Sequence, residues 1–419
     1  MIPLDDRVGP RASTPAPAPG RPRILYVLVS RGAGTGGHHI SLRDLAARIR
    51  ATADVRIVTV AYKPPPALEG VPDVHFVRHG AWRMGLTEAA LWRHCREFRP
   101  TVIHSYDSYA LIMVRPLSAL LGIPLVHTQC GGPTARVHLP RAPDVVVFSE
   151  ENLQGMSAQR RMSRCRLHHI ASRVEDVSPD PSRVEALRAH LALSPDDFVI
   201  LRINRFVAPY EPVMRQTLAL AALMRAAGLP ARAVLLGSAN DPEVVARIAA
   251  LADPRDVLVH APAFTTCAAE LLPLANAVVG TGRGLMEAAS LGRPLFASVQ
   301  DRKLPVPVDP ETVEALFAAN FSPRAVLTLD DAALADRAVV LLSSPERAAA
   351  AGAYARHLFE TRFDVQAAVN RHLEIYAQAV PWPRWELPEA VVDLSATTAQ
   401  ELYVRARTPR AARPGVADP

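Results

Sequence analysis

The sequence predicts an α/β protein of two domains, each with a parallel sheet covered by helices. Short apolar runs alternate with amphipathic stretches along most of the chain, which is typical of buried strands joined by crossover helices. The alternation starts at Arg23 and starts again at Phe198, and 419 residues are enough for two such domains. Residues 276–298 show the pattern most clearly, as strand, glycine turn, helix, turn and strand.

Composition excludes several classes of protein. The hydrophobic content of 49% is ample for buried cores, and the net charge of +6 is spread along the chain, so nothing argues for a nucleic-acid partner. Four cysteines without a C-x-x-C pair indicate neither a zinc site nor a redox motif. No apolar run is as long as a membrane span, and residues 1–20 lack a signal-peptide core and read as a flexible tail. We therefore expect a cytoplasmic protein without an integral membrane segment, and its oligomeric state is left open.

The first domain is expected at residues 21–172. A buried strand at 23–30 is followed by a glycine-rich turn and by a helix whose apolar face includes residues 40–49. A turn between the first strand and first helix is where nucleotide-binding α/β domains approach phosphates. Gly36, Gly37 and His38 are therefore candidate site residues, although the two histidines at 38 and 39 also fit an exposed helix start.

Polar residues follow two later strands of this domain. His104 and Asp107 come at the end of a strand at 101–104, and Gln129 and Gly131 follow a strand at 123–128. Ligands of parallel sheets bind beyond the carboxyl ends of the strands, so these four are candidates for a cleft. The remaining strands are expected at 55–60, 74–77, 144–149 and 167–170, with helices at 86–98 and 109–121 and with Ser149 as a helix cap.

The second domain is expected at residues 196–360, after a polar, proline-containing hinge at 173–195. Its strands are expected at 198–202, 231–236, 257–260, 277–279 and 294–298, and its helices at 212–227, 242–252, 267–272, 285–291, 331–342 and 345–359. Residues 306–325 form a rim or lid, residues 361–380 a last helix, and residues 381–419 a partly disordered tail.

The glycine turn at 280–284 carries the main functional signal. Glycines allow a tight turn and close approach of a ligand, and the helix that follows offers unpaired N–H groups to a phosphate. Arg283 adds a fork of donors, and Glu287, one helical turn further on, is placed to accept hydrogen bonds from sugar hydroxyls. The alternative is an ordinary βα turn with a solvated glutamate.

The stretch GRGLMEAASLGRPLFAS resembles the C-terminal nucleotide-binding motif of the retaining GT-B glycosyltransferases of the glycogen-synthase-like group, also called group 1. The resemblance implies two Rossmann-like domains that face a cleft, with a C-terminal helix crossing back. It also implies that Glu287 holds the ribose of a nucleotide sugar and that the amides of Gly282, Arg283 and Gly284 face its diphosphate. Arg205 resembles the arginine of the family's Gly-Arg-Leu motif, which meets the diphosphate; its alternative is a surface ion pair with Glu211.

The chain departs from the family in three places. Val279 stands where the family has a second glutamate, Tyr210 stands where it has a lysine, and the histidine that faces the donor sugar has no clear counterpart. The Gly36, Gly37 and His38 stretch resembles the family's Gly-Gly pair at the interdomain cleft.

The resemblance implies transfer of a sugar from a nucleotide diphosphate sugar to a small-molecule or glycan acceptor, with retention at the anomeric carbon. No cofactor beyond this donor and no metal are implied, and the sequence has no Asp-x-Asp motif. Two alternatives stay open: a nucleotide-sugar epimerase of the same architecture, and a non-catalytic relative that binds a nucleotide sugar or a partner protein.

Overall fold

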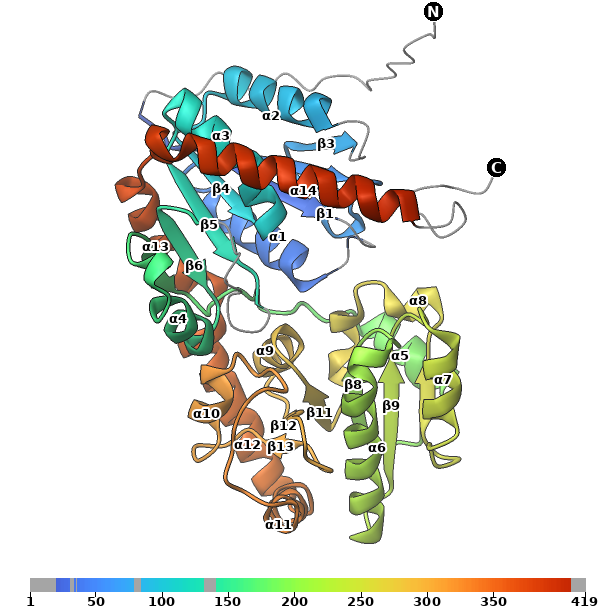
Figure 1. Cartoon of the computed structure of the whole chain (residues 1–419). Helices are drawn as coiled ribbons and strands as arrows, with labels where there is room; N and C mark the ends of the chain where they lie inside the picture. The colour runs from blue at the N-terminus through green and yellow to red at the C-terminus, as the bar shows by residue number, and fades with distance from the viewer. Residues whose placement is uncertain (1–19, 31–33, 35, 79–83, 132–140, 408–419) are drawn as a thin grey trace, which may run out of the picture.

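The computed structural model describes residues 20–30, 34, 36–78, 84–131 and 141–407. Two α/β domains lie one above the other in Figure 1, with the N-terminal domain mainly in blue to blue-green and the second in green through yellow to orange. The predicted fold class, a GT-B arrangement of two Rossmann-like sheets with a C-terminal helix that returns to the first domain, is confirmed.

The first sheet has seven parallel strands in the order β3-β2-β1-β4-β5-β6-β7. Its strands are β1 (Arg23–Ser30), β2 (Asp54–Ala61), β3 (Val74–Arg78), β4 (Val102–Tyr106), β5 (Leu125–Gln129), β6 (Asp144–Val147) and β7 (Arg166–His169). The strand order reverses between β1 and β4, and the carboxyl ends of strands at such a point are where open parallel sheets bind ligands.

Helices cover both faces of this sheet. They are α1 (Gly37–Ile49), α2 (Met84–Phe98), α3 (Ser108–Leu121) and α4 (Glu150–Ser157). Odd-numbered residues of β1 such as Val27 pack in one core with α2 and α3, and even-numbered ones such as Leu28 pack in another with α1. Ser149 caps α4 as expected, because its hydroxyl accepts a hydrogen bond from the amide of Asn152 at 3.1 Å.

The second sheet has the order β10-β9-β8-β11-β12-β13 and is parallel apart from β13. Its strands are β8 (Phe198–Ile203), β9 (Ala231–Leu236), β10 (Val257–Val259), β11 (Ala277–Gly280), β12 (Leu295–Ala297) and β13 (Val306–Pro307). Its helices are α5 (Pro181–His190), α6 (Glu211–Ala226), α7 (Pro242–Ala249), α8 (Pro262–Thr265), α9 (Arg283–Ser290), α10 (Val313–Ala318), α11 (Asp331–Leu342) and α12 (Pro345–Leu358).

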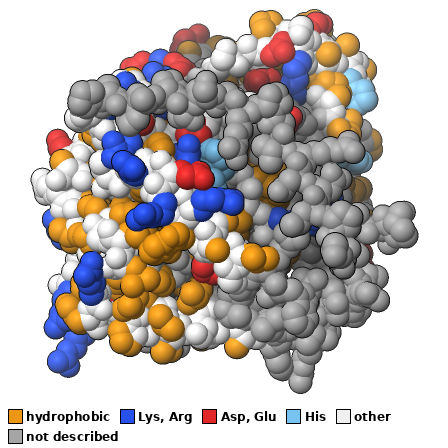
Figure 2. Space-filling view, turned by 90° about the horizontal axis from the view of Figure 1, so that it is seen from above, with side chains coloured by type: hydrophobic (Ala, Val, Ile, Leu, Met, Phe, Trp, Pro, Cys, Tyr) orange, Lys and Arg blue, Asp and Glu red, His pale blue; other side chains and the backbone are white. Residues whose placement is uncertain are grey.

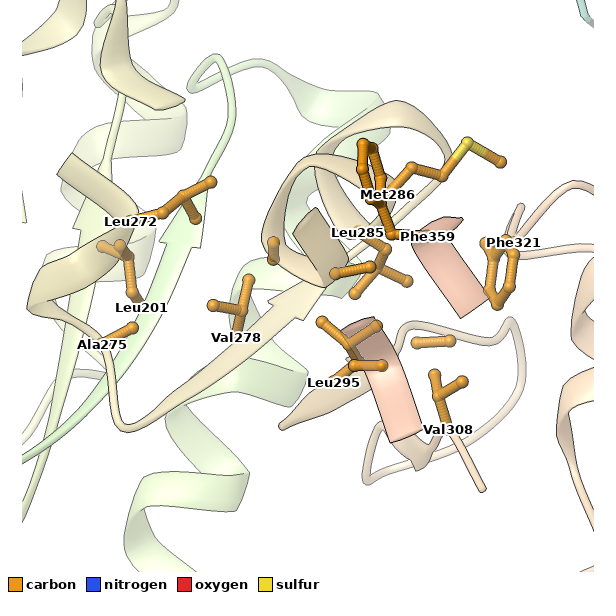
Figure 3. Packing of buried hydrophobic residues seen from close by; sticks show 14 of the residues in the cluster. Leu201, Leu272, Ala275, Val278, Leu285, Met286, Leu295, Val308, Phe321 and Phe359 are labelled. Atoms are coloured by element: carbon orange, nitrogen blue, oxygen red, sulfur yellow. The ribbon is translucent and has the colours of Figure 1, made fainter. Parts of the chain in front are cut away.

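The helix behind the glycine turn is anchored firmly in this domain. Leu285 and Met286 of α9 are fully buried, and Figure 3 shows them beside Phe359, with Phe321 nearby. Because such a core leaves little freedom to shift, the start of α9 is held in a fixed place relative to the sheet.

The chain returns to the first domain through a π-helical turn (Phe359–Phe363) and α13 (Val365–Gln378). The hydroxyl of Tyr376 in α13 lies 2.9 Å from the hydroxyl of Tyr26 in β1. These contacts confirm the predicted crossover helix.

Two segments differ from the sequence prediction. The stretch expected as a hinge, 173–195, contains α5, which Asp180 caps through the amides of Ser182 and Arg183. The expected tail at 381–419 contains α14 (Leu387–Arg407), which packs against α3, whereas residues 408–419 lie outside the described part. The fully buried guanidinium of Arg115 in α3 explains this helix, because it donates to Asp393 of α14 at 2.5 Å.

The surface agrees with the spread of charge seen in the sequence. On the face shown in Figure 2, basic side chains are interspersed with hydrophobic and acidic ones where atoms are described. Among the described helices, none combines the length and the apolar character needed to cross a membrane.

Candidate functional site

The turn between β11 and α9 depends on its glycines. Gly282 has φ of +51°, a backbone conformation that residues with a side chain rarely adopt, and it is the N-cap of α9. A Cβ added at Gly280 would lie 2.8 Å from Cγ of Leu285, which is too close. The predicted glycine turn therefore exists where the sequence placed it.

The start of α9 offers two backbone donors, whereas the sequence predicted three. The amide of Gly282 donates to the carbonyl of Phe321 at 2.9 Å, and the amides of Leu285 and Met286 donate to the carbonyl of Gly282. Within the described residues, the amides of Arg283 and Gly284 have no acceptor. These two N–H groups, at the positive end of the helix dipole, are available to an anion.

Arg205 lies just beyond the end of β8 and is exposed. Its guanidinium carbon stands 5.8 Å from the ring centroid of Tyr210. It does not pair with Glu211, which instead binds Arg215 at 2.6 Å and Arg247 at 2.9 Å. Since no carboxylate pairs with Arg205 in the described part of the chain, its charge is available to a ligand.

Arg283 has other partners than the phosphate expected from the sequence. Its Nε donates to Oε1 of Glu287 at 2.7 Å, its Nη2 donates to Asp44, and its Nη1 donates to the carbonyl of Arg173 at 2.7 Å and to the hydroxyl of Ser41 at 3.2 Å. Asp44 and Ser41 belong to α1, so this guanidinium ties the two domains together. A direct role of its side chain at a phosphate stays a prediction, and it would require these bonds to exchange.

Glu287 lies one turn into α9, as predicted, with 17% of its side chain exposed. Its Oε1 accepts from Arg283, and its Oε2 receives no hydrogen bond from the described residues. One carboxylate oxygen is therefore fixed and the other is available to a hydroxyl.

The start of α1 meets the second domain at this place. A Cβ added at Gly37 would lie 3.7 Å from Cδ of Arg283. The half-buried His38 is close enough to Arg205 for that charge, after burial, to lower its pKa. Gly36 is the N-cap of α1. Residues 37 and 38 thus bring Arg205 and α9 to one interdomain region.

The two histidines are not an exposed helix start. His39 is only 2% exposed, and burial, followed by the neighbouring His38, lowers its pKa to about 3. His39 is therefore a neutral, packed side chain, and only His38 of the pair lies at the interdomain region.

His104 does not lie at the cleft, which corrects the sequence prediction. It is fully buried inside β4, with Nδ1 2.7 Å from the hydroxyl of Tyr376 and Nε2 2.7 Å from that of Thr128. Burial lowers the pKa of His104 well below its ordinary value. The strand continues to Tyr106, two residues further than predicted, and this places His104 within the sheet.

Asp107, Gln129 and Gly131 do follow the carboxyl ends of β4 and β5. Asp107 has φ of +112° and is held by bonds from three amides, with Oδ1 accepting from Tyr109 and Ala110 and Oδ2 from Val29 at 2.8 Å. Its carboxylate therefore serves the backbone. The amide nitrogen of Gln129 donates to the carbonyl of Gly131 at 3.1 Å, so these two residues shape the same loop.

Ser41 and Asp44 are not among the candidate residues predicted from the sequence, although the sequence carries a signal for them. Gly37, Ser41, Asp44 and Arg48 recur at helical spacing and form one polar face of α1. Ser41 and Asp44 bond to Arg283, and Arg48 pairs with Glu175 of the interdomain segment. Gly37 faces Arg283 as well, since a Cβ added there would lie 3.7 Å from its Cδ. A polar stripe opposite an apolar one usually faces solvent, but here it faces the second domain.

Two hollows on the surface lie elsewhere. One, of about 450 Å³, is lined by residues of α6 with Asp253 and Asp256, and the other, of about 420 Å³, by Arg141, Arg161, Glu389 and Asp393. Neither includes a candidate residue. The site is thus defined by converging donors and charges in the interdomain region.

Comparison with solved structures shows the same architecture. HepE of Anabaena in complex with UDP-glucose is 16% identical, with a TM-score of 0.61 over 85% of this chain and 99% of the other. A glycosyltransferase from Rickettsia africae is 11% identical, with a TM-score of 0.62 over 86% and 98%. The UDP-GlcNAc 2-epimerase of Neisseria meningitidis, bound to UDP-GlcNAc, is 13% identical, with a TM-score of 0.52 over 85% and 100%. No curated protein sequence matches the chain significantly.

These likenesses and the two parallel sheets show that the chain has the GT-B fold. Residues 35–169, which make up most of the first domain, match the family model described as Glycosyltransferase Family 4. This match covers the first domain only, and it agrees with the family resemblance that the motif in the second domain carries.

Proposed function

We propose that this chain is a glycosyltransferase that moves a sugar from a UDP-sugar to an acceptor, with retention at the anomeric carbon and without a metal. The observation that carries the proposal is the arrangement around α9. This region holds four groups without a hydrogen-bond or ion-pair partner among the described residues: the amides of Arg283 and Gly284, the guanidinium of Arg205 and Oε2 of Glu287. They lie near Gly37 and His38 of the first domain. The choice of uridine rests on the UDP and UDP-glucose bound by HepE.

The proposed chemistry follows from where charge develops. As the bond between the sugar and the diphosphate breaks, negative charge grows on the leaving diphosphate, and donors already in place stabilise it. The amides of Arg283 and Gly284 and the guanidinium of Arg205 supply these donors. The two amides need no reorganisation at that step, because the start of α9 already fixes them.

The carboxylate of Glu287 orients the donor. Its Oε1 accepts a hydrogen bond from Nε of Arg283, which fixes the carboxylate. Its Oε2 then accepts a hydrogen bond from a ribose hydroxyl. In this proposal Arg283 therefore has two functions: its amide binds the diphosphate, and its side chain holds Glu287 in place.

The proposed acceptor site lies against the first domain, where Gly36, Gly37, His38, Asp107, Gln129 and Gly131 are found. Asp107 has its carboxylate oxygens engaged by backbone amides, so we propose that it shapes this region rather than reacting. The transferred sugar is proposed to be a hexose, and the acceptor a small molecule or glycan.

The experiment is incubation with UDP-glucose and other UDP-hexoses in EDTA, with and without a mixed panel of acceptors. Release of UDP that depends on acceptor, with the anomeric configuration kept in the product, supports the proposal. Conversion of UDP-GlcNAc to its epimer without release of UDP would replace the proposal with epimerisation. Binding without turnover would leave a nucleotide-sugar-binding protein, and loss of transfer in EDTA would overturn the metal-free site.

A further inference from the structure

Four arginines are less than 10% exposed in the described part of the chain: Arg56, Arg115, Arg173 and Arg202. A buried guanidinium stays charged and is costly unless a carboxylate neutralises it. Arg56 pairs with Asp73 at 3.2 Å, and Arg115 pairs with Asp393 at 2.5 Å. These two arginines lie far from the β11–α9 turn and follow the usual rule.

Arg202, in β8, has no such partner. Its Nε donates to Asn204 Oδ1 at 3.3 Å, its Nη1 to the carbonyl of Val279 at 3.2 Å, and its Nη2 to the hydroxyl of Thr281 at 3.3 Å. All three acceptors are neutral, and no described carboxylate comes within ion-pair distance. Burial lowers the pKa of Arg202 to about 10, so the group is charged at neutral pH.

Arg173, in the segment between the domains, is in the same situation. Its Nη1 donates to the carbonyl of Ala171 at 2.7 Å, its Nη2 to Asn320 Oδ1 at 2.6 Å, and its guanidinium lies over the ring of Phe148. Burial, followed by repulsion from Arg283, lowers the pKa of Arg173 to about 9. Glu287 is near enough for its charge to raise the pKa of Arg173, but its carboxylate is bonded to Arg283.

Both uncompensated arginines border the same turn. Arg202 bonds to the residues on either side of Gly280, and a Cβ at Gly280 would lie 3.4 Å from its Nη1. Arg173 holds Asn320, whose carbonyl faces Gly282 and whose neighbour Phe321 accepts the amide of Gly282. The turn thus lies between two buried positive charges.

We propose that Arg202 and Arg173 are positioning residues whose buried charges are neutralised by the diphosphate of the donor, so that they make the site selective for two phosphates. The two arginines hold the turn in place, and the electric field of their buried charges is only weakly screened by water. This inference rests on the proposed function and adds the source of its selectivity. Arg202 also supplies charge close to Tyr210, the tyrosine over which Arg205 lies.

The test is calorimetric titration of the full chain with uridine, UMP and UDP at one ionic strength. R202Q keeps a hydrogen-bonding side chain but removes the charge, and R202K keeps the charge. We expect R202Q and R173Q each to weaken UDP binding about tenfold more than uridine binding, with UMP between them, and R202K to retain most of the preference. An equal loss for all three ligands would show that these arginines only support the fold, and would overturn the inference.

Thermal unfolding supplies a second readout. Removing an uncompensated buried charge relieves its desolvation and so offsets the three hydrogen bonds that are lost. Ligand-free R202Q should therefore melt close to the wild type, while the rise in Tm that UDP produces becomes smaller. R115Q is the matched control, because it removes the buried partner of an ion pair with Asp393 and should melt lower without changing the preference for UDP over uridine. A large loss of ligand-free stability in R202Q contradicts the inference. If the wild type bound none of the three ligands, the proposed function and the inference would both fail. If the wild type preferred UDP and R202Q kept that preference, only the inference would fail.

Discussion

Arg283 of the second domain and Asp44 of the first form an ion pair across the interdomain region, with side chains that are 11% and 2% exposed. The same guanidinium holds Glu287, so one side chain connects the proposed ribose ligand to α1. The position of the donor is therefore coupled to the position of the first domain through Arg283. Asp44 itself has a second partner, Nε of Arg43 at 3.0 Å.

Asp44→Ala should destabilise the protein, because it leaves Arg283 with a single carboxylate in a nearly buried place. Loss of one partner of a buried pair costs about 3 kcal/mol or more, and we expect somewhat less here because Glu287 remains. Urea denaturation measures the loss. Glu360→Gln, which breaks the exposed pair with Arg356, should stay within about 0.5 kcal/mol of wild type, and equal effects of the two changes would contradict the role of the interdomain pair.

Arg205→Ala and Glu287→Ala should each weaken UDP binding by about tenfold to a hundredfold, the effect of losing a charge-assisted hydrogen bond. Arg205 acts on the diphosphate and Glu287 on the ribose, so only the Glu287 change should also weaken binding of uridine. Calorimetric titration separates the two effects. Arg347→Ala, at an exposed position of α12, is the control, and unchanged affinity in both site variants would refute the assignment.

Stability should fall as the pH is lowered below about 6.5. Burial lowers the pKa of His104 well below its ordinary value and those of His127 and His372 to about 4. The unfolded chain, with histidine pKa near 6.5, then binds more protons than the folded chain, so the stabilisation is complete above pH 6.5 and is lost as the pH falls toward 4.

The histidine contribution can be isolated with His104→Asn, which removes one of these groups. Each buried neutral histidine contributes about 1.4 kcal/mol per pH unit to the slope in this window. Urea denaturation at pH 7, 6 and 5 should show a slope smaller by about that amount than in the wild type. His357→Asn changes an exposed histidine and should keep the wild-type slope; an unchanged slope in His104→Asn would show that this histidine is protonated in the folded state.

Removal of residues 387–419 should lower Tm strongly, since it takes α14 away from Arg115 and α3. The loss of the carboxylate partner of Arg115 and the exposure of the apolar face that α14 covers both destabilise the fold. Removal of residues 408–419 alone keeps α14 and serves as the control. A similar Tm in both truncated chains would show that α14 does not support the first domain.

Local patterns were sufficient to predict the layout of the sheets. Continuous apolar runs such as 23–30 became buried strands, and the glycine turn before α9 lies where its residues indicated, because both depend on neighbours in the sequence. The prediction placed Arg205 and Glu287 in one interdomain region by resemblance, and the contacts of His38 and Gly37 are consistent with it.

The features that the sequence did not predict depend on contacts between residues far apart in the chain. Arg283 finds Asp44, 239 residues away, so its side chain is engaged in the ion pair where a phosphate contact was expected. His104 is inside β4 because the strand runs two residues longer than its apolar run, and Tyr376 of α13 covers it. The segment after Pro381 is helical because Arg115 and α3 hold it, which a Pro-, Ala- and Arg-rich composition does not reveal.

A crystal structure of the chain with UDP tests the central claim most directly. We predict diphosphate oxygens about 3 Å from the amides of Arg283 and Gly284 and from the guanidinium of Arg205, with a ribose hydroxyl on Oε2 of Glu287. UDP bound elsewhere, with these four groups free of the ligand, would contradict the account.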